Sequence, residues 1–280
     1  MGFKLSAGGL LALLALQIEV IYGPAICRLL LASAVSSLKE SSSHVLLACL
    51  GDILFCAYLF FRVKDIRWGR VQVSYVARAL LLCVVGLGMH YALTTWVPST
   101  SYPSLSLINI VDPVEGGVSV PRVLTVVLLS PLKEELVFRV LALQAAQDMT
   151  NSVLFAVSTQ SMLFAMLHSL NTATASVSRH YVWLQIVFGL VCGLNFGLRA
   201  HLSGVLECVV LHVMNNAFAM FVPQLAMFDL YDNVTFLLLL QALGFQLWQL
   251  YLSFQQYRQQ QRRVSPSEHA SNAAVRAKQA

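Results

Sequence analysis

The chain has 280 residues, of which 58% are hydrophobic and 11% are charged, and its formal net charge is +5. A soluble domain carries about a quarter charged residues. This composition therefore excludes an ordinary soluble protein and indicates a polytopic membrane protein folded as one bundle. The basic residues lie in short loops and in the tail, without a cluster of interleaved aromatic residues, so no nucleic-acid partner is expected. The six cysteines form no CxxC pair, which argues against a disulfide framework or zinc thiolates.

Eight apolar runs are long enough to cross a bilayer as helices, because a span takes about 20 predominantly apolar residues. In chain order they are expected at residues 7–31, 45–61, 74–97, 118–147, 152–170, 181–198, 203–222 and 230–252. The first contains Glu19, Pro24 and Arg28, which favours a kink, and it is expected to be retained as a helix because it lacks a signal-peptide cleavage motif. The predicted fold class is all-α, a polytopic transmembrane helical bundle of about eight spans.

The fourth run is interrupted by Pro131-Leu-Lys-Glu134-Glu135, so it can be a membrane helix only where those charges face protein or water. We predict one membrane domain over residues 1–253, with a motif-bearing core at about 118–222. Residues 254–280 form a basic polar tail that offers no apolar face to bury, and the sequence predicts disorder there.

The distribution of basic residues predicts the topology, because cytoplasmic loops are enriched in Lys and Arg. The segment 62–70 carries four basic residues and the tail carries five more, so both are expected in the cytosol. An even number of spans places the N-terminus on the same side. The segment 98–117 holds Asp112 and Glu115 but no Lys or Arg, and we expect it on the opposite face, together with Asn233-Val-Thr235.

Polar residues recur at helical spacing inside three of the apolar runs. Ionisable side chains are costly in hydrocarbon, and those that persist there usually pair with one another or line a functional cavity. Residues at i and i+4 share a helix face. The spacing therefore predicts that Glu135 reaches Arg139 and that His212 and Asn216 project into one space. The three patterns are Glu134-Glu135-x-x-x-Arg139, Phe164-x-x-x-His168 and His212-x-x-x-Asn216.

The two adjacent glutamates are expected to act differently. Glu134 lies about 100° round the helix from Glu135, so the arginine can hold one carboxylate while the other faces elsewhere. A poorly solvated carboxylate accepts a proton more readily than one in water, which makes Glu134 the candidate general base. Glu135, held by Arg139, is then an orienting group or a second acid. A buried Glu135–Arg139 pair that only fixes helix packing is the alternative.

The two histidines predict further parts of a polar reaction centre. His212 and Asn216 offer two donors on one helix face, which is what a tetrahedral oxyanion requires. His168 lies on a separate helix and is the second candidate for activating water. Glu134, His168 and His212 are also a possible zinc-ligand set. No HExxH pattern is present, so our preferred interpretation needs no cofactor and zinc stays open as the alternative.

These residues together resemble the CPBP family of intramembrane proteases, which is named for CAAX proteases and bacteriocin-processing enzymes. The resemblance covers roughly residues 120–222 and includes the three patterns in their family order. The stretch between the two histidines is similar to the Ras-converting type of CAAX prenyl endopeptidase. It contains Phe188-Gly189, Phe196-x-x-Arg199 and His201-Leu202-x-Gly204.

The resemblance implies an endopeptidase that removes the C-terminal tripeptide of prenylated CAAX proteins, such as small GTPases. It implies a location in the lipid bilayer, in the endoplasmic reticulum membrane. An apolar cavity open to lipid suits an isoprenoid tail, because each buried methylene contributes about 0.8 kcal/mol. In the family pattern, water is activated by Glu134 and His168, supported by Glu135 and Arg139, while the oxyanion is held by His212 and Asn216.

Two other functions stay open at this point. A CPBP-family protease could cut some other membrane peptide with the same residues. A non-enzymatic membrane scaffold, or a transporter that uses the buried charges as an ion relay, would also retain ionisable groups in its helices. A transporter is expected to show repeated halves with paired broken helices, and the sequence has no visible internal repeat.

Overall fold

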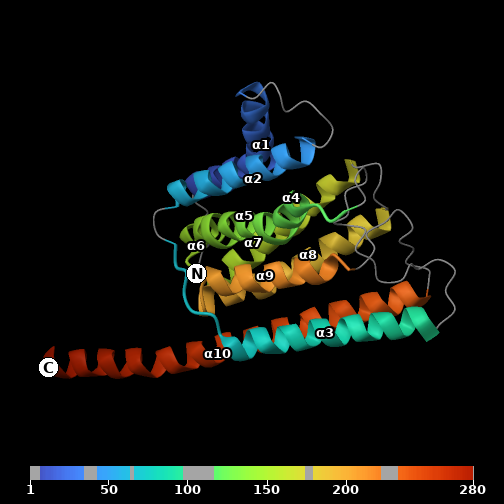
Figure 1. Ribbon diagram of the computed structural model, residues 1–280. Coiled ribbons are helices and arrows are strands. Elements are labelled where there is room, and N and C mark those ends of the chain that lie inside the picture. Colours follow the sequence, from blue (N-terminus) through green and yellow to red (C-terminus); the bar gives the residue numbers. More distant parts are fainter. Residues whose placement is uncertain are drawn as a thin grey trace.

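The computed structural model describes residues 7–34, 43–63, 66–96, 117–173, 179–221 and 233–279, and these ranges are almost entirely helical (Figure 1). The predicted all-α bundle is confirmed. In chain order the elements are α1 (Ala7–Ala34), α2 (Ser43–Arg62), α3 (Val73–Trp96), α4 (Val120–Val123), η1 (Leu124–Leu129), α5 (Ser130–Glu135), η2 (Leu136–Ala142), α6 (Leu143–Thr150), α7 (Val153–Leu167), η3 (His168–Ala173), α8 (Arg179–Leu202), α9 (Val205–Ala219) and α10 (Asn233–Gln279).

The elements from α4 to α6 follow one another without a break, so the fourth predicted run is one helical segment with two π-helical stretches, η1 and η2. The other predicted runs correspond to α1, α2, α3, α7, α8, α9 and α10. Five helical spans in the described ranges are long and apolar enough to cross a membrane. They are Val45–Arg62, Val73–Trp96, Val153–Leu170, Arg179–Leu202 and Phe236–Arg263.

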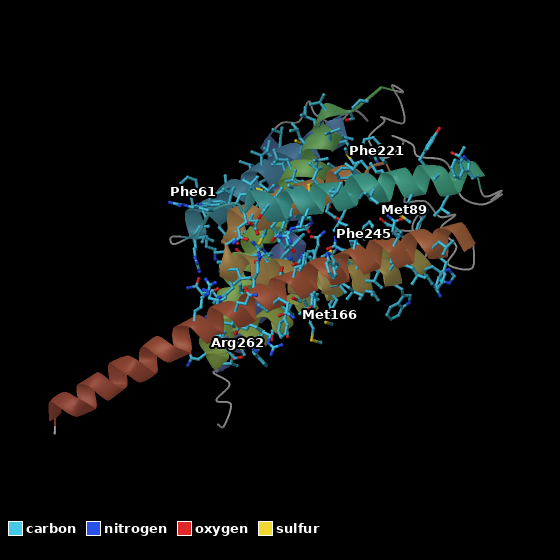
Figure 2. The ribbon with its side chains drawn as sticks, turned by 90° about the horizontal axis from the view of Figure 1, so that it is seen from below. Phe61, Met89, Met166, Phe221, Phe245 and Arg262 are labelled. Carbon is cyan, nitrogen blue, oxygen red and sulfur yellow. The ribbon has the colours of Figure 1, made fainter. Side chains whose placement is uncertain are left out.

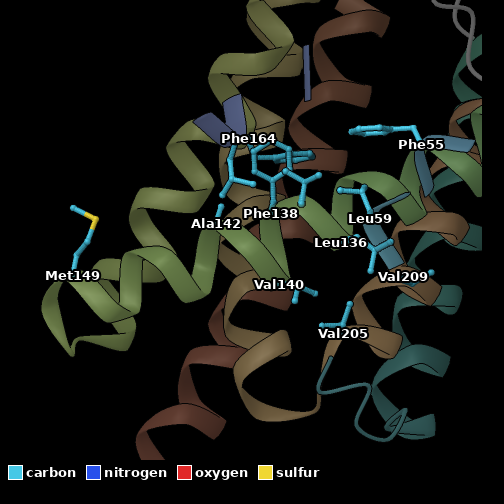
Figure 3. Close-up of a cluster of buried hydrophobic side chains, with 12 residues drawn as sticks. Phe55, Leu59, Leu136, Phe138, Val140, Ala142, Met149, Phe164, Val205 and Val209 are labelled. Carbon is cyan, nitrogen blue, oxygen red and sulfur yellow. The ribbon is translucent and has the colours of Figure 1, made fainter. Parts of the chain in front are cut away.

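The helices stack in layers, with α1 and α2 on one side of the bundle and α3 and α10 side by side on the other (Figure 1). Between these layers lie α5, α7, α8 and α9. The segment that carries the two glutamates is therefore central. Leu136, directly after Glu135, is fully buried and belongs to an apolar cluster with Leu59 of α2 and Val209 of α9 (Figure 3).

A stripe of glycines lets α8 approach α7 closely. Gly189, Gly193 and Gly197 recur every four residues and so lie on one helix face. A Cβ at Gly193 would lie 3.0 Å from the Cα of Ser161, and one at Gly197 would lie 2.4 Å from the Nε2 of Gln160. Small residues at this spacing allow close helix packing in membranes. The stripe therefore sets α7 against α8.

The segment between α2 and α3 is fixed against the turn between α8 and α9. The backbone N–H of Val205 donates to the carbonyl of Arg67 at 3.1 Å. Gly69 has a φ of +69°, and a Cβ there would lie 1.7 Å from the Ser203 carbonyl oxygen, so only glycine fits. Part of the predicted basic loop is thus held by backbone hydrogen bonds against the turn that joins α8 to α9.

The tail departs from the prediction. A frayed helix end followed by disorder was expected after residue 253, and α10 instead continues as a helix to Gln279 and extends beyond the bundle (Figure 1). The tail is rich in Gln, Arg and Ala, which are strong helix formers, and it prolongs a helix that packing has already started. The expectation for residues 98–117, including Asp112 and Glu115, lies almost wholly outside the described residues.

Candidate active site

Glu135 lies fully buried between a cation and an imidazole. Its Oε1 accepts a hydrogen bond from His212 Nδ1 at 2.7 Å. Its Oε2 lies 3.0 Å from Arg139 Nε, at ion-pair distance but without hydrogen-bond alignment. The side chains of Glu135 and Arg139 are both 0% exposed. The contact that the i, i+4 spacing predicts is therefore present, and it extends across helices to His212 of α9.

Arg139 is held on its other side by α7 and α8. Its Nη1 donates to Gln160 Oε1 at 2.8 Å, and its guanidinium carbon lies 4.8 Å from the ring centroid of Phe164 and 5.6 Å from that of Phe196. Gln160 in turn donates from Nε2 to the Gly193 carbonyl at 2.9 Å. Gln160 was not among the predicted residues, although a glutamine in the middle of an apolar run was an available signal.

Glu134 occupies a different environment from Glu135, as the sequence predicted. Its side chain is 22% exposed, and its Oε2 lies 3.6 Å from His212 Nε2. The two nitrogens of His212 therefore face the two adjacent carboxylates, Nδ1 toward Glu135 and Nε2 toward Glu134. With its proton on Nδ1 donated to Glu135, the neutral ring has Nε2 as an acceptor; the imidazolium has donors at both nitrogens.

His168 is oriented by the backbone of its own helix. Its Nδ1 lies 3.0 Å from the Phe164 carbonyl oxygen, and its ring meets the Phe164 ring edge-on with centroids 4.9 Å apart. A carbonyl oxygen can only accept, so Nδ1 is the donor in this contact. The neutral ring then has Nε2 as a proton acceptor, which is the form a general base needs.

Asn216 is anchored by a carbonyl that Pro131 leaves without a helical donor. The N–H of Ser130 donates to the Thr125 carbonyl in the π-helical register, and proline at 131 has no N–H. Neither usual donor is therefore available to the carbonyl of Val126. Asn216 Nδ2 donates to that oxygen at 2.9 Å. The second hydrogen of the same amide remains for another acceptor.

Four of the six predicted site residues line one cavity of about 460 Å³, namely Glu134, His168, His212 and Asn216. The other two, Glu135 and Arg139, support His212 from behind. The helices α3, α8 and α10, which carry none of the three polar patterns, also form its walls. Its apolar lining includes Leu82, Leu87, Leu184, Phe188, Phe218, Leu238, Leu239 and Phe245.

The zinc alternative requires Glu134, His168 and His212 to form one ligand set. Among the residues that the structure describes, no three His, Cys, Asp or Glu side chains gather into a group that could hold a metal ion. These contacts of Nδ1, from His212 to Glu135 and from His168 to a backbone carbonyl, leave Nε2 as the ring nitrogen that a metal would use, so the spacing of the three side chains decides the fit. As arranged here, the three residues do not fit a zinc site, and we derive no step through a metal.

Two further ion pairs with a buried carboxylate support the bundle, and neither was predicted. Arg199 of α8 pairs with Glu207 of α9, both fully buried, and the guanidinium carbon lies 4.1 Å from the Tyr75 ring centroid. Lys133 Nζ lies 3.0 Å from the Oδ1 of buried Asp52, which ties the glutamate segment to α2. Neither pair lines the cavity.

The fold and the site together define an all-α integral membrane protein with a carboxylate–imidazole centre on an internal, largely apolar cavity. Residues 116–218, which carry all three polar patterns, match the family described as type II CAAX prenyl endopeptidase Rce1-like. Comparison with curated proteins and with solved structures gave no match. The resemblance recognised from the three patterns is confirmed, and the match supports a CAAX-type intramembrane protease at the family level.

Proposed function

We propose that this protein removes the C-terminal tripeptide of prenylated CAAX proteins, including small GTPases, in the endoplasmic reticulum membrane with its C-terminus in the cytosol. One observation carries the proposal. Glu134, His168, His212 and Asn216 come from separate parts of the family-matched region and converge on one largely apolar cavity. A cavity with this lining accommodates a peptide bond at the polar residues and an isoprenoid chain along the apolar wall.

The proposed reaction is hydrolysis by an activated water. Glu134, assisted by His168, accepts a proton from water, and the resulting hydroxide attacks the carbonyl carbon of the peptide bond after the prenylated cysteine. His212 in its imidazolium form, through Nε2–H, and Asn216, through its second amide hydrogen, donate hydrogen bonds to the oxygen that becomes negative. The C–N bond breaks as Glu134 returns the proton to the leaving nitrogen. The products are a prenylcysteine carboxylate and a free tripeptide.

Glu135 and Arg139 are positioning residues in this scheme. Glu135 accepts from His212 Nδ1, which fixes the ring so that Nε2 faces the cavity side. Arg139 balances the buried charge of Glu135 and is itself fixed by Gln160. A buried charge that has its partners in place stays ordered without water, which preorganises the donors for the transition state.

Purified protein with peptide substrates tests the function directly. We expect cleavage of a farnesylated CAAX peptide after its cysteine, no cleavage of the same peptide with a free thiol, and no effect of a chelator. Cleavage of an unrelated membrane peptide in place of the farnesylated one would identify the other kind of CPBP protease. Loss of activity in chelator, restored by zinc, would contradict the metal-free mechanism. Absence of cleavage of every peptide would favour a scaffold or ion relay.

Replacing Asn216 by alanine is expected to lower kcat by about 10²–10³-fold with little change in KM, because the lost donor acts on the developing oxyanion. Steady-state kinetics with the farnesylated peptide measures this. Asn195→Ala is the matched control, because Asn195 is a buried asparagine that accepts from Tyr75 at 2.9 Å and does not line the cavity. An equal drop in kcat for both variants would show that Asn216 acts only through packing.

A further inference from the structure

The α10 wall of the cavity carries polar amides that the proposed chemistry does not use. Gln241, Gln246 and Gln249 all line the cavity, and Gln246 and Gln249 are only 8% and 6% exposed. The Oε1 atoms of Gln241 and Gln246 are buried without a hydrogen-bond partner among the described residues. Unpaired amides are costly in an apolar environment, so a buried glutamine without a partner needs an explanation.

Helix α3 leaves room for one of these amides. Figure 2 shows α3 and α10 side by side, with Phe245 labelled between them. On α3, Gly86 also lines the cavity, and a Cβ there would lie 2.9 Å from Gln241 Nε2. Any larger residue at this position would press on the amide. The absence of a side chain at Gly86 therefore leaves room for Gln241, which lines the same cavity as Glu134.

The chemistry of this wall indicates what it binds. A glutamine amide offers both a donor and an acceptor, as a peptide group does. An extended peptide against the apolar part of the cavity wall must have its own N–H and C=O groups paired. Among the described lining residues there is no lysine or arginine, so the wall is not built for an anionic group. The terminal torsion of glutamine is soft, which lets either end of the amide turn to a ligand.

We propose that Gln241 and Gln246 bind the main chain of the substrate peptide and hold it in register with Glu134. This inference rests on the proposed function, because its ligand is the peptide of that reaction. The amides contact backbone groups and therefore favour an extended segment of any side-chain sequence. Specificity for the prenyl group is left to the apolar lining.

Binding to a non-cleaving protein tests the wall apart from catalysis. The probe is a dye-labelled farnesylated CAAX peptide, and its binding to Glu134→Gln protein is measured in detergent. The measurement is repeated with a series of peptides in which a different single backbone amide is N-methylated each time. We expect Gln246→Leu, added to this protein, to weaken binding about five- to tenfold. In the parent Glu134→Gln protein, N-methylation of one particular backbone amide should weaken binding by a similar factor. In the protein that also carries Gln246→Leu or Gln241→Leu, the same N-methylation should weaken binding little.

Gln259→Leu is the matched control, because Gln259 is an exposed glutamine on the same helix, outside the cavity, and we expect unchanged affinity. Two peptides are compared on one protein, so a partly folded variant does not mimic the effect. Equal N-methylation penalties in parent and variants, or unchanged affinity of Gln246→Leu, would overturn the inference. Wild-type cleavage is measured in parallel. If the N-methylation penalty is lost in the glutamine variants but no peptide is cleaved, the proposed function alone is contradicted. If the peptide is cleaved but the penalty is the same in parent and variants, the binding role of Gln241 and Gln246 alone is contradicted.

Discussion

Glu134→Gln protein is expected to fold and insert normally and to lose cleavage by about 10²–10⁴-fold or more, because the substitution removes a general base and keeps its shape. The side chain is partly exposed to the cavity and lies 3.6 Å from His212 Nε2, so it is not a packing element of the core. Turnover of the farnesylated peptide at saturation measures the loss. Thermal unfolding in detergent should match wild type.

Glu207→Gln is the control for this substitution. Glu207 is fully buried, pairs with Arg199 and accepts from the backbone N–H of Gln72, all outside the cavity. Its loss should lower stability and leave the kcat of the folded fraction close to wild type. Near-normal turnover by a well-folded Glu134→Gln protein would mean that another group activates the water.

Arg139→Ala is expected to damage both stability and activity. The substitution strands the buried carboxylate of Glu135 and removes the partner of Gln160, and breaking a buried pair in this way costs about 3–5 kcal/mol. His212 then loses the fixed acceptor that orients it, so cleavage should fall with stability. Yield, thermal unfolding in detergent and kcat of the folded protein are the measurements.

A second buried arginine separates the two effects. Arg199→Ala also strands a fully buried glutamate, but away from the cavity, so it should lower stability while the folded fraction keeps its kcat. In the double variant Glu135→Gln/Arg139→Met no charge is stranded, and we expect stability to recover without activity. An Arg139→Ala protein as stable as wild type would show that Glu135 has another counter-ion.

The sequence predicts what depends on local spacing. Runs of apolar residues place all eight helical segments, and the i, i+4 rule predicts the contact between Glu135 and Arg139. The same rule separates Glu134 from Glu135, and the structure gives the two carboxylates different exposures. These predictions hold because the geometry of one helix is fixed by its own backbone.

The sequence did not predict which helices contact one another. The hydrogen bond from His212 to Glu135 joins α9 to the fourth segment, and no spacing rule reaches across that gap. Membrane helices are apolar on most faces, so their pattern does not show which neighbours they choose. For this reason α3 and α10 were missed as cavity walls, although the glycine stripe of α8 was a readable signal for its packing.

The absence of an amide hydrogen at Pro131 has a consequence for which substitutions this site can accept during evolution. The carbonyl of Val126 accepts from Asn216 because the backbone offers it no donor. Any other residue at 131 would supply an N–H that competes for that oxygen, and the asparagine would lose its anchor. A proline in one helix and an amide in another are therefore epistatic partners, joined by one acceptor atom. Mutational drift at either position is constrained by the residue present at the other.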